Sequence, residues 1–531
     1  MTNDIAAGRT TRRAPRRLIA LAAAVSAAFL LAAPHQSGAA EPTADPMDNW
    51  TYDADSQRLA AGANYFRYLE KEGKLVGRTT PRELSIVRID PSAGPIRVEN
   101  SFGKKAGVQE TVREQLSSKP LAGINASFGT YDERSDGVES MAFYGLAARD
   151  GVINGVSCVF VSDTDKDADG RYVTAREGMM ATVLQYGFPH ISRLKSKLTV
   201  QVSATANGPA IASRPLDDVN RTPGRAQGCA RDLDDANNAH SVAYSASSTE
   251  TVYQDPDELI VFNGNYGVPT PPKDLDKKIP GDDAAGLELV VGKDGLIGGA
   301  PKTVRGGQQV AAGGHALQAI GEESEKWLED HAIAGRYLQV VQEVIDVGSP
   351  TNAPNKTGIT EQPRTVTLDS STDIVSNMHW LLHDGEPAPG LSTCKRLYDV
   401  NGNRVESDTS KRARQAGDFC RDSRTAIGVD EQGRTLFVTI TGPRNPGTPT
   451  SKNEAEKMAD GAFMWEVRDI LRRWGAVDAM NLDGGGSTTM LVNDERKTGL
   501  TDITTKDGQL HWTERKVGDS VYVGRGGLPL P

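Results

Sequence analysis

The segment Ala476-Val-Asp-Ala-Met-Asn-Leu-Asp-Gly-Gly-Gly-Ser-Thr-Thr-Met-Leu-Val492 decides the fold of the C-terminal region. Residues 476–482 and 488–492 are rich in apolar side chains, which predicts two buried strands. Three consecutive glycines between them predict a tight turn at the carboxyl end of the first strand, because glycine adopts backbone conformations that other residues avoid.

The sequence before this segment predicts further strands and a helix. Arg424–Val429 and Thr435–Ile440 are strand-like and are joined by a turn at Asp430–Gly433, and Ser451–Glu454 fits a capping box that starts a helix. That helix is expected to bury a stripe at helical spacing: Ala455, Ala459, Ala462, Phe463, Val467, Ile470, Leu471 and Trp474. Short strands are also expected at 84–89, 96–98, 121–129, 259–262, 287–291 and 337–341. We therefore predict an α+β fold of mixed and antiparallel sheets with packed helices.

The glycine turn carries groups that suit catalysis on an anion. The backbone N–H groups of Gly484, Gly485 and Gly486 can form a concavity for an anion, Asp483 supplies a carboxylate, and Ser487 and Thr488 supply hydroxyls. A nucleotide-binding phosphate loop is excluded because no lysine follows the glycines. A tight turn without function is the alternative interpretation of these residues.

The segment from Asn481 to Met490 resembles the signature of the phosphodiester glycosidase family. Other pieces are similar to the family as well: Arg424–Gly428, Trp474–Met480, Thr513–Val517, Gly123–Phe128 and Val219–Arg221. The resemblance is strong over 424–523 and patchy over 84–380. The sequence departs from the family pattern at His379–Gly385, where the family is usually glycine-rich, and at Ser423, where it has proline.

The resemblance implies an enzyme that cleaves a sugar–O–phosphate bond, which needs groups that bind phosphate and carboxylates that move protons. Asp483 is the first catalytic candidate and Glu514 the second, although Glu514 fits a structural partner of Arg515 equally well. Arg424 and Arg515 are expected to bind phosphate, because a guanidinium matches its oxygens in pairs. The remaining substrate-binding candidates are Asn125, Arg221, Asn481, Gly484, Gly485, Gly486, Ser487 and Thr488.

The N-terminus has the order of a bacterial signal peptide. Five arginines between Arg9 and Arg17 precede an apolar run, Leu18–Ala33, and small residues follow at 38–40. We expect residues 1–40 to be a signal peptide, 41–80 an N-terminal extension and 81–531 a phosphodiester glycosidase-like domain with insertions. The apolar run is short for a permanent anchor, so a secreted protein is expected, with an uncleaved anchor as the alternative.

The net charge indicates which partners to exclude, and the four cysteines indicate which disulfides to expect. The formal net charge is −10, and removal of the arginine-rich leader makes the protein more acidic, which argues against nucleic acid as a partner. Four cysteines in an exported chain suggest two disulfides. We expect Cys394–Cys420, which closes a short polar loop, and therefore Cys158–Cys229. No cofactor is expected to be required.

One acidic loop matches part of a calcium-binding motif. Asp165, Asp167, Asp169 and Gly170 fall at positions 1, 3, 5 and 6 of such a loop, but Arg176 stands where a bidentate glutamate is expected. An acidic surface turn is the alternative, and a bound calcium would be structural.

The leading hypothesis is an exported glycosidase that hydrolyses a sugar-1-phosphodiester linkage in envelope or extracellular glycan. The second is a non-catalytic cell-envelope polysaccharide-binding protein that retains the fold. The third is a serine hydrolase that uses Ser487, which the sequence disfavours because Gly485–Thr489 is not a GxSxG elbow.

Overall fold

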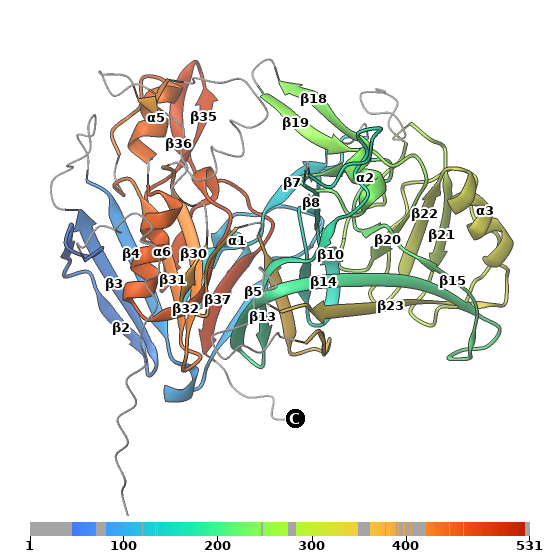
Figure 1. Cartoon of the computed structure of the whole chain (residues 1–531), viewed down its shortest axis with the longest axis horizontal. Coiled ribbons are helices and arrows are strands. Elements are labelled where there is room, and N and C mark those ends of the chain that lie inside the picture. Colours follow the sequence, from blue (N-terminus) through green and yellow to red (C-terminus); the bar gives the residue numbers. More distant parts are fainter. Residues whose placement is uncertain are drawn as a thin grey trace, which may run out of the picture. The chain divides into compact units, whose positions relative to one another are not determined.

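The computed structural model shows a protein built mostly of β-strands (Figure 1). The structure describes residues 45–525 except 71–80, 119, 133, 135, 163, 246–247, 274–282, 349–361, 378, 389–390, 392–396, 399–403, 406–420, 445 and 460. The predicted α+β class is wrong, because most sheets pack against other sheets rather than against helices. The longest helices in the described residues, α3 (Glu322–His331) and α6 (Met464–Arg473), each have ten residues.

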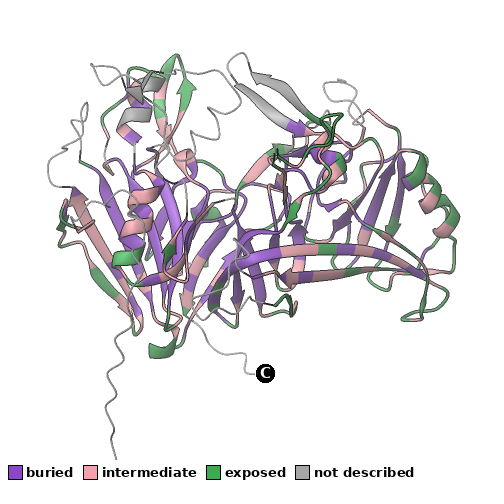
Figure 2. Ribbon diagram, viewed as in Figure 1, coloured by how far each residue is buried: buried purple, intermediate pink, exposed green. Residues whose placement is uncertain are grey.

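A nine-stranded sheet forms the part of the molecule that carries the glycine turn. Its strands run in the order β1-β3-β4-β31-β30-β32-β26-β27, with β2 paired to β3. They are β1 (Trp50–Tyr52), β2 (Gln57–Ala60), β3 (Ala63–Glu70), β4 (Glu83–Ile89), β26 (Trp380–His383), β27 (Glu386–Pro387), β30 (Arg424–Asp430), β31 (Thr435–Thr441) and β32 (Ala476–Asn481). Strands β1–β3 come from the predicted N-terminal extension, so those residues are integral to the sheet. Every residue of β30 and β31 is buried (Figure 2).

The sequence predicts one helix here and the structure has two, of which α6 covers one face of this sheet and α5 (Lys452–Ala459) lies against β35 (Asp502–Lys506). Helices α5 and α6 are separated at Gly461. A Cβ at Gly461 would lie 2.3 Å from the Asp422 carbonyl and 2.4 Å from that of Ile440, so the chain passes against the sheet here and the helix is interrupted. The predicted capping box forms in part: the Glu454 N–H donates to Ser451 Oγ (3.2 Å), but the Glu454 carboxylate accepts from Thr450.

The other face of the nine-stranded sheet packs against a five-stranded sheet of order β34-β33-β6-β37-β5. These strands are β5 (Ile96–Ser101), β6 (Ala122–Asn125), β33 (Met490–Val492), β34 (Glu495–Arg496) and β37 (Ser520–Arg525). Their shared core includes Ile427, Met480, Ile124 and Met490. The glycine turn leaves the first sheet at β32 and enters the second at β33, so it lies where the two sheets meet.

An eight-stranded sheet and a four-stranded sheet enclose the second large core. The eight-stranded sheet has the order β10-β9-β25-β13-β14-β23-β24, with β15 paired to β14. Its strands are β9 (Ala147–Arg149), β10 (Val152–Gly155), β13 (Met179–Gln185), β14 (Phe188–Ser203), β15 (Ala210–Pro215), β23 (Tyr337–Asp346), β24 (Arg364–Val366) and β25 (Thr372–Ser376). The four-stranded sheet contains β16 (Asp218–Val219), β20 (Glu258–Asn263), β21 (Leu287–Val291) and β22 (His315–Ile320), and α3 packs on it through Leu328.

Smaller elements complete the described chain. They are α1 (Val112–Gln115), α2 (Leu233–Asn237) and five short pairings: β7 (Gly129–Asp132) with β8 (Ser140–Phe143), β11 (Val159–Phe160) with β12 (Arg176–Glu177), β17 (Ala226–Gln227) and β18 (Ala239–Ser245) with β19 (Ser248–Tyr253), β28 (Leu397–Tyr398) with β29 (Arg404–Val405), and β35 (Asp502–Lys506) with β36 (Gln509–Thr513). The disulfide Cys158–Cys229 is present, with a Cα–Cα distance of 5.7 Å.

The predicted strands are confirmed as β4, β5, β6, β20, β21, β23, β30, β31, β32 and β33. Among the described residues, no helix is both long enough and apolar enough to cross a membrane. The predicted signal peptide and the predicted pair Cys394–Cys420 lie outside the described residues.

Candidate active site

The glycine turn is fixed between two sheets by backbone hydrogen bonds. The Leu482 N–H donates to the Thr425 carbonyl (2.8 Å) in the nine-stranded sheet, and the Asp483 N–H donates to the Ala126 carbonyl (2.9 Å) beside β6. A short 3₁₀ turn, η2 (Gly485–Ser487), follows, with Gly485 at a φ of +57°. Because both ends are anchored in sheets, the groups on this turn have defined positions.

Asp483 is a buried carboxyl group with a shifted proton affinity. Its residue is 8% exposed, and its Oδ1 accepts from the Gly484 N–H (2.8 Å). Burial and, to a smaller extent, the charge of Asp422 raise the pKa of Asp483, while Ser487, Arg515 and the Gly484 N–H oppose the shift; the net result is a pKa of about 6. A carboxyl group with this pKa can both donate and accept a proton near neutral pH, as an acid–base catalyst must.

Arg515 lies directly against the turn. A Cβ at Gly486 would be 2.4 Å from Arg515 Cζ, so only glycine leaves room for the guanidinium there. Asp502 holds that guanidinium through Nε and Nη2, both at 3.0 Å. Desolvation acts to lower the pKa of Arg515, but the carboxylates of Asp502, Asp483 and Asp422 outweigh it and raise the pKa. The side chain is still 46% exposed, so a substrate anion can reach it.

Arg424 approaches the turn from the other side. It is buried at the start of β30, and its Nε donates to the Ala462 carbonyl (3.2 Å). Its Nη1 lies 4.0 Å from the position that a Cβ on Gly484 would take. The two arginines predicted to bind phosphate therefore both flank the glycine turn, although they are 91 positions apart in the sequence.

A second carboxylate beside Asp483 is Asp422, which the sequence analysis does not identify. Asp422 Oδ2 lies 3.5 Å from the position of a Cβ on Gly485, and its charge acts on both Asp483 and Arg515. Two backbone hydrogen bonds with Ala462 hold Asp422 in place (3.2 and 2.7 Å). The only sequence signal is its position two residues before Arg424, because its pairing with Ala462 is a long-range contact.

Glu514, the predicted second carboxylate, faces a different partner. Its Oε1 lies 3.3 Å from Arg496 Nη1. Arg496 in turn donates to the carbonyls of Thr488 (3.2 Å) and Gly499 (3.0 Å). These contacts favour the structural interpretation of Glu514, as a support for the residues behind the turn.

Two of the predicted polar ligands have different roles in the structure. Asn125 is fully buried: its Nδ2 donates to the Asp483 carbonyl (2.6 Å), and its Oδ1 accepts from Thr425 Oγ1 (2.8 Å) and the Thr489 N–H (3.0 Å). Its side chain is thus engaged within the protein and positions Asp483. By contrast, Asn481 Oδ1 is buried and accepts no hydrogen bond from the described residues, so it can accept one from a ligand.

The hydroxyls and the atypical histidine segment lie close by. The Ser487 hydroxyl is hydrogen-bonded to Asp483, and Thr488 is fully buried. The His379 carbonyl accepts from the Asn481 N–H (3.0 Å), and β26 pairs with β32. The unusual His379–Gly385 segment therefore contains the strand next to β32, the strand that ends two residues before Asp483.

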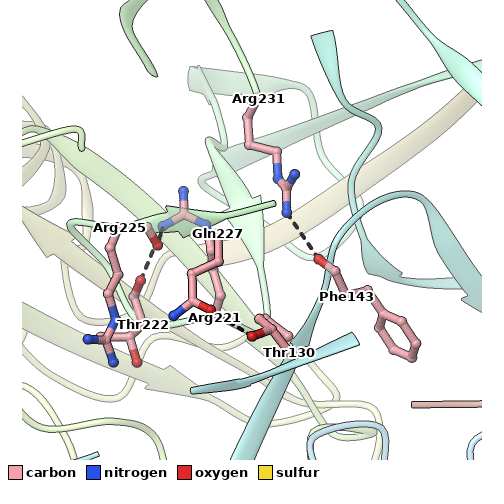
Figure 3. Close-up of a pocket in the computed structure, with 8 residues that line it drawn as sticks. Thr130, Phe143, Arg221, Thr222, Arg225, Gln227 and Arg231 are labelled. Carbon is pink, nitrogen blue, oxygen red and sulfur yellow. Dashed lines mark hydrogen bonds between the residues drawn. The ribbon is translucent and has the colours of Figure 1, made fainter. Parts of the chain in front are cut away.

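Arg221 belongs to a separate pocket. Figure 3 shows it with Thr130, Thr222, Arg225, Gln227 and Arg231 around that pocket. The guanidinium of Arg221 is paired with Asp218 (2.7 Å) and Glu258 (3.0 Å). Within the described residues, no recorded contact joins Arg221 to the glycine turn.

The fold and the turn together define a class of site, in which a buried carboxyl group with a pKa near neutrality, a second carboxylate and two arginines surround the glycine turn. The predicted concavity of backbone amides is not free for an anion, because the Gly484 N–H donates to Asp483 Oδ1 (2.8 Å) and the Gly485 N–H donates to the Ser423 carbonyl (2.8 Å). Such a site suits acid–base chemistry on an anionic substrate.

Comparison with known proteins shows a family resemblance in the part of the chain that carries the glycine turn. Residues 334–524 match the phosphodiester glycosidase family, so the resemblance to this family is confirmed for the C-terminal part of the chain.

The similar proteins of known activity are distant. The chain is 26% identical over 122 residues to N-acetylglucosamine-1-phosphodiester alpha-N-acetylglucosaminidase of Mus musculus and, over the same length, to that of Homo sapiens. Each match covers 23% of this chain and 19% of the relative, so the chain spans about a fifth of the length of these relatives. A crystal structure of a Burkholderia pseudomallei protein named as exported has the same fold, with a TM-score of 0.62 and 17% identity over 90% of this chain and 97% of that one.

Proposed function

We propose that the protein is a hydrolase that cleaves the bond between a sugar and the oxygen of a phosphodiester. The observation that carries this proposal is the placement of Asp483, a carboxyl group with a pKa raised to about 6, on a turn flanked by Arg515 and Arg424. The match of residues 334–524 to the phosphodiester glycosidases supports the choice of reaction.

The residues divide the reaction between them in the following way. Protonated Asp483 donates its proton to the bridging oxygen as the bond from the sugar C1 to that oxygen breaks, and the phosphomonoester leaves. Arg515 and Arg424 bind the charge on the phosphate. The Asp422 carboxylate accepts a proton from the water that attacks C1. The free sugar and a phosphomonoester are the products.

Two other residues complete the arrangement. Asn481 Oδ1, which is buried and unpaired among the described residues, accepts a hydrogen bond from a sugar hydroxyl. Asn125 acts through Asp483 as a positioning residue, because all its recorded hydrogen bonds are within the protein. Ser487 serves as a hydrogen-bond donor to Asp483 rather than as a nucleophile.

The proposed location is outside the cytoplasm. The Cys158–Cys229 disulfide supports it, because disulfides persist in oxidising compartments, and so does the arginine-rich leader with its apolar run. The substrate class that follows is phosphodiester-linked glycan of the envelope or the extracellular space.

The test is hydrolysis of a panel of sugar-1-phosphodiesters by the purified protein and two variants. Asp483→Asn removes the proton donor, and we expect it to abolish sugar release. Asp507→Asn, in the turn between β35 and β36, is the matched control and should retain full activity. Sugar release by the Asp483→Asn variant at the wild-type rate would refute the role of Asp483, and glycan binding without turnover by the wild type would favour the binding-protein alternative.

A further inference from the structure

A group of three carboxylates lies close to Arg221, whose charge acts on two of them. Asp217, Asp232 and Asp255 each place one oxygen within 4.8 Å of the oxygens of the other two. They come from three segments: the residue before β16, the N-cap of α2 and the loop before β20. All three are half-buried. Oxygens around one calcium ion, each about 2.4 Å from the metal, are separated by distances up to about 5 Å, so this spacing fits a cation between them.

The nearby arginines do not neutralise these carboxylates. Arg221 is paired with Asp218 and Glu258, and Arg231 Nε is paired with Asp218 (2.8 Å). In the part of the chain that the structure describes, neither Asp217 nor Asp232 nor Asp255 forms an ion pair with a lysine, arginine or histidine. Within the described residues the cluster therefore has no direct ion-pair partner, and the charge of Arg221, which is itself paired with Glu258, acts on Asp217 and Asp255 without a salt bridge.

Asp235 gives an independent indication of a missing ligand. It is 2% exposed, and its Oδ2 accepts from the Arg231 N–H (2.7 Å). Its Oδ1 is buried and has no hydrogen-bond partner among the described residues. Its N–H donates to Asp232 Oδ1 (2.9 Å), so the two carboxyl groups share the first turn of α2. A buried carboxylate oxygen without a partner is costly, and a bound cation with its water would satisfy it.

The electrostatics of the cluster agree with this arrangement. Burial, followed by the charge of Glu258, raises the pKa of Asp217 to about 8 and that of Asp255 to about 7. The same two causes raise the pKa of Asp235, and Asp232 adds to them. The charge of Glu258 thus acts on Asp217, Asp235 and Asp255 alike.

We propose that Asp217, Asp232 and Asp255, with Asp235 behind them, form a binding site for a divalent cation. An all-oxygen set of ligands with solvent on one side suits calcium, which takes six to eight oxygens including water. The ion would tie together the starts of β16, α2 and β20. The chain between the first two carries Arg221 and Cys229, so the ion would hold the Arg221 pocket in shape. This proposal does not depend on the proposed glycosidase activity.

The experiment is calcium binding by the purified protein after treatment with EDTA, measured by equilibrium dialysis and by thermal unfolding. We expect one calcium ion per chain and a higher melting temperature with calcium. The double variant Asp217→Asn/Asp255→Asn should bind calcium at least tenfold more weakly. In EDTA it should melt no lower than the wild type, because the substitutions remove repulsion between like charges while an asparagine at 217 can still accept from the Leu259 N–H.

The acidic loop with Asp165, Asp167 and Asp169 provides the matched control. Among the described residues, the oxygens of Asp165, Asp167 and Asp169 do not all come within 4.8 Å of one another, and Asp167 Oδ1 accepts from the N–H groups of Asp169 (3.0 Å) and Arg171 (2.9 Å), so this loop lacks the spacing of the proposed site. Asp167→Asn should leave calcium binding unchanged. Loss of binding in Asp167→Asn, unchanged binding in the double variant, or no binding by the wild type at millimolar calcium would each overturn the proposal.

Discussion

Substitution of Gly486 by alanine tests whether the position of Arg515 matters for activity. Gly486 does not have a positive φ, so its backbone tolerates an alanine. The added Cβ would lie 2.4 Å from Arg515 Cζ and from Nη2, and 2.7 Å from Nε. The clash is with the end of a flexible side chain rather than with backbone. The expected result is therefore that Arg515 moves away from the turn while the fold is retained.

The size of the effect follows from what Arg515 contacts. Its pair with Asp502 is 46% exposed on the arginine side, and exposed ion pairs contribute about 0–1 kcal/mol to stability. The loss of one preorganised group that stabilises charge in the transition state reduces kcat by about 10²–10³-fold. We therefore expect Gly486→Ala to lose about two to three orders of magnitude in kcat/KM with a small change in Tm.

The assay is initial-rate hydrolysis of the best sugar-1-phosphodiester, together with thermal unfolding of the same samples. Gly299→Ala is the control, since Gly299 has no positive φ and a Cβ there would meet nothing within 4 Å. Wild-type activity in Gly486→Ala would refute the reasoning that Arg515 acts from this position. A large fall in Tm would show instead that the substitution damages the turn itself.

Three further predictions follow from the same site. The pKa of Asp483 is raised to about 6, above about 3.9 in the unfolded chain, so the folded state binds more protons from about pH 4 to 6 and this group costs up to about 3 kcal/mol of stability as pH rises through that window. Asp519, whose pKa is also raised to about 6, titrates in the same window; urea unfolding at both ends of the window should therefore show a loss of stability that is smaller in Asp483→Asn than in the wild type by about 3 kcal/mol, and an equal loss in both would contradict the shift. Asn125→Ala should cost about 2–4 kcal/mol of stability, measured by urea unfolding, because the Asp483 carbonyl and the Thr489 N–H lose their buried partner; a cost below about 1 kcal/mol would be inconsistent with that role. Asp422→Asn should reduce kcat and lower the apparent pKa that Asp483 contributes to the pH–rate profile, because it removes a like charge beside Asp483. Glu514→Gln should leave that apparent pKa unchanged. A shifted pKa in Glu514→Gln and an unchanged one in Asp422→Asn would restore Glu514 as the second carboxylate.

The sequence predicted the strands that carry the site because their apolar residues are local and continuous. Strands β30, β31 and β32 are buried along nearly their whole length, so their composition identifies them without any knowledge of the partners. The class of the fold was not predictable in the same way. The sheets pack on one another through contacts between strands far apart in the chain, and the one clear helical stripe, 455–474, led to an α+β interpretation.

The same distinction applies to the site residues. Asp483 and the glycines could be proposed as site residues because they are adjacent in the sequence. Arg424 and Arg515 could be proposed because they lie in segments that resemble a known family. Asp422 could not, because its place beside Gly485 depends on the bridge between Asp422 and Ala462. Asn125 was predicted as a ligand on its residue type, but its three hydrogen-bonding contacts all lie within the protein, and no local pattern indicates them.

Hydrolysis of a sugar-1-phosphodiester in ¹⁸O-labelled water tests the central claim most directly, because it reports which bond breaks. If water attacks the sugar C1 while Asp483 protonates the leaving phosphate oxygen, mass spectrometry will find the label in the released sugar and none in the phosphomonoester. Label in the phosphomonoester would mean that water attacks phosphorus, and it would contradict the assignment of the protein as a glycosidase.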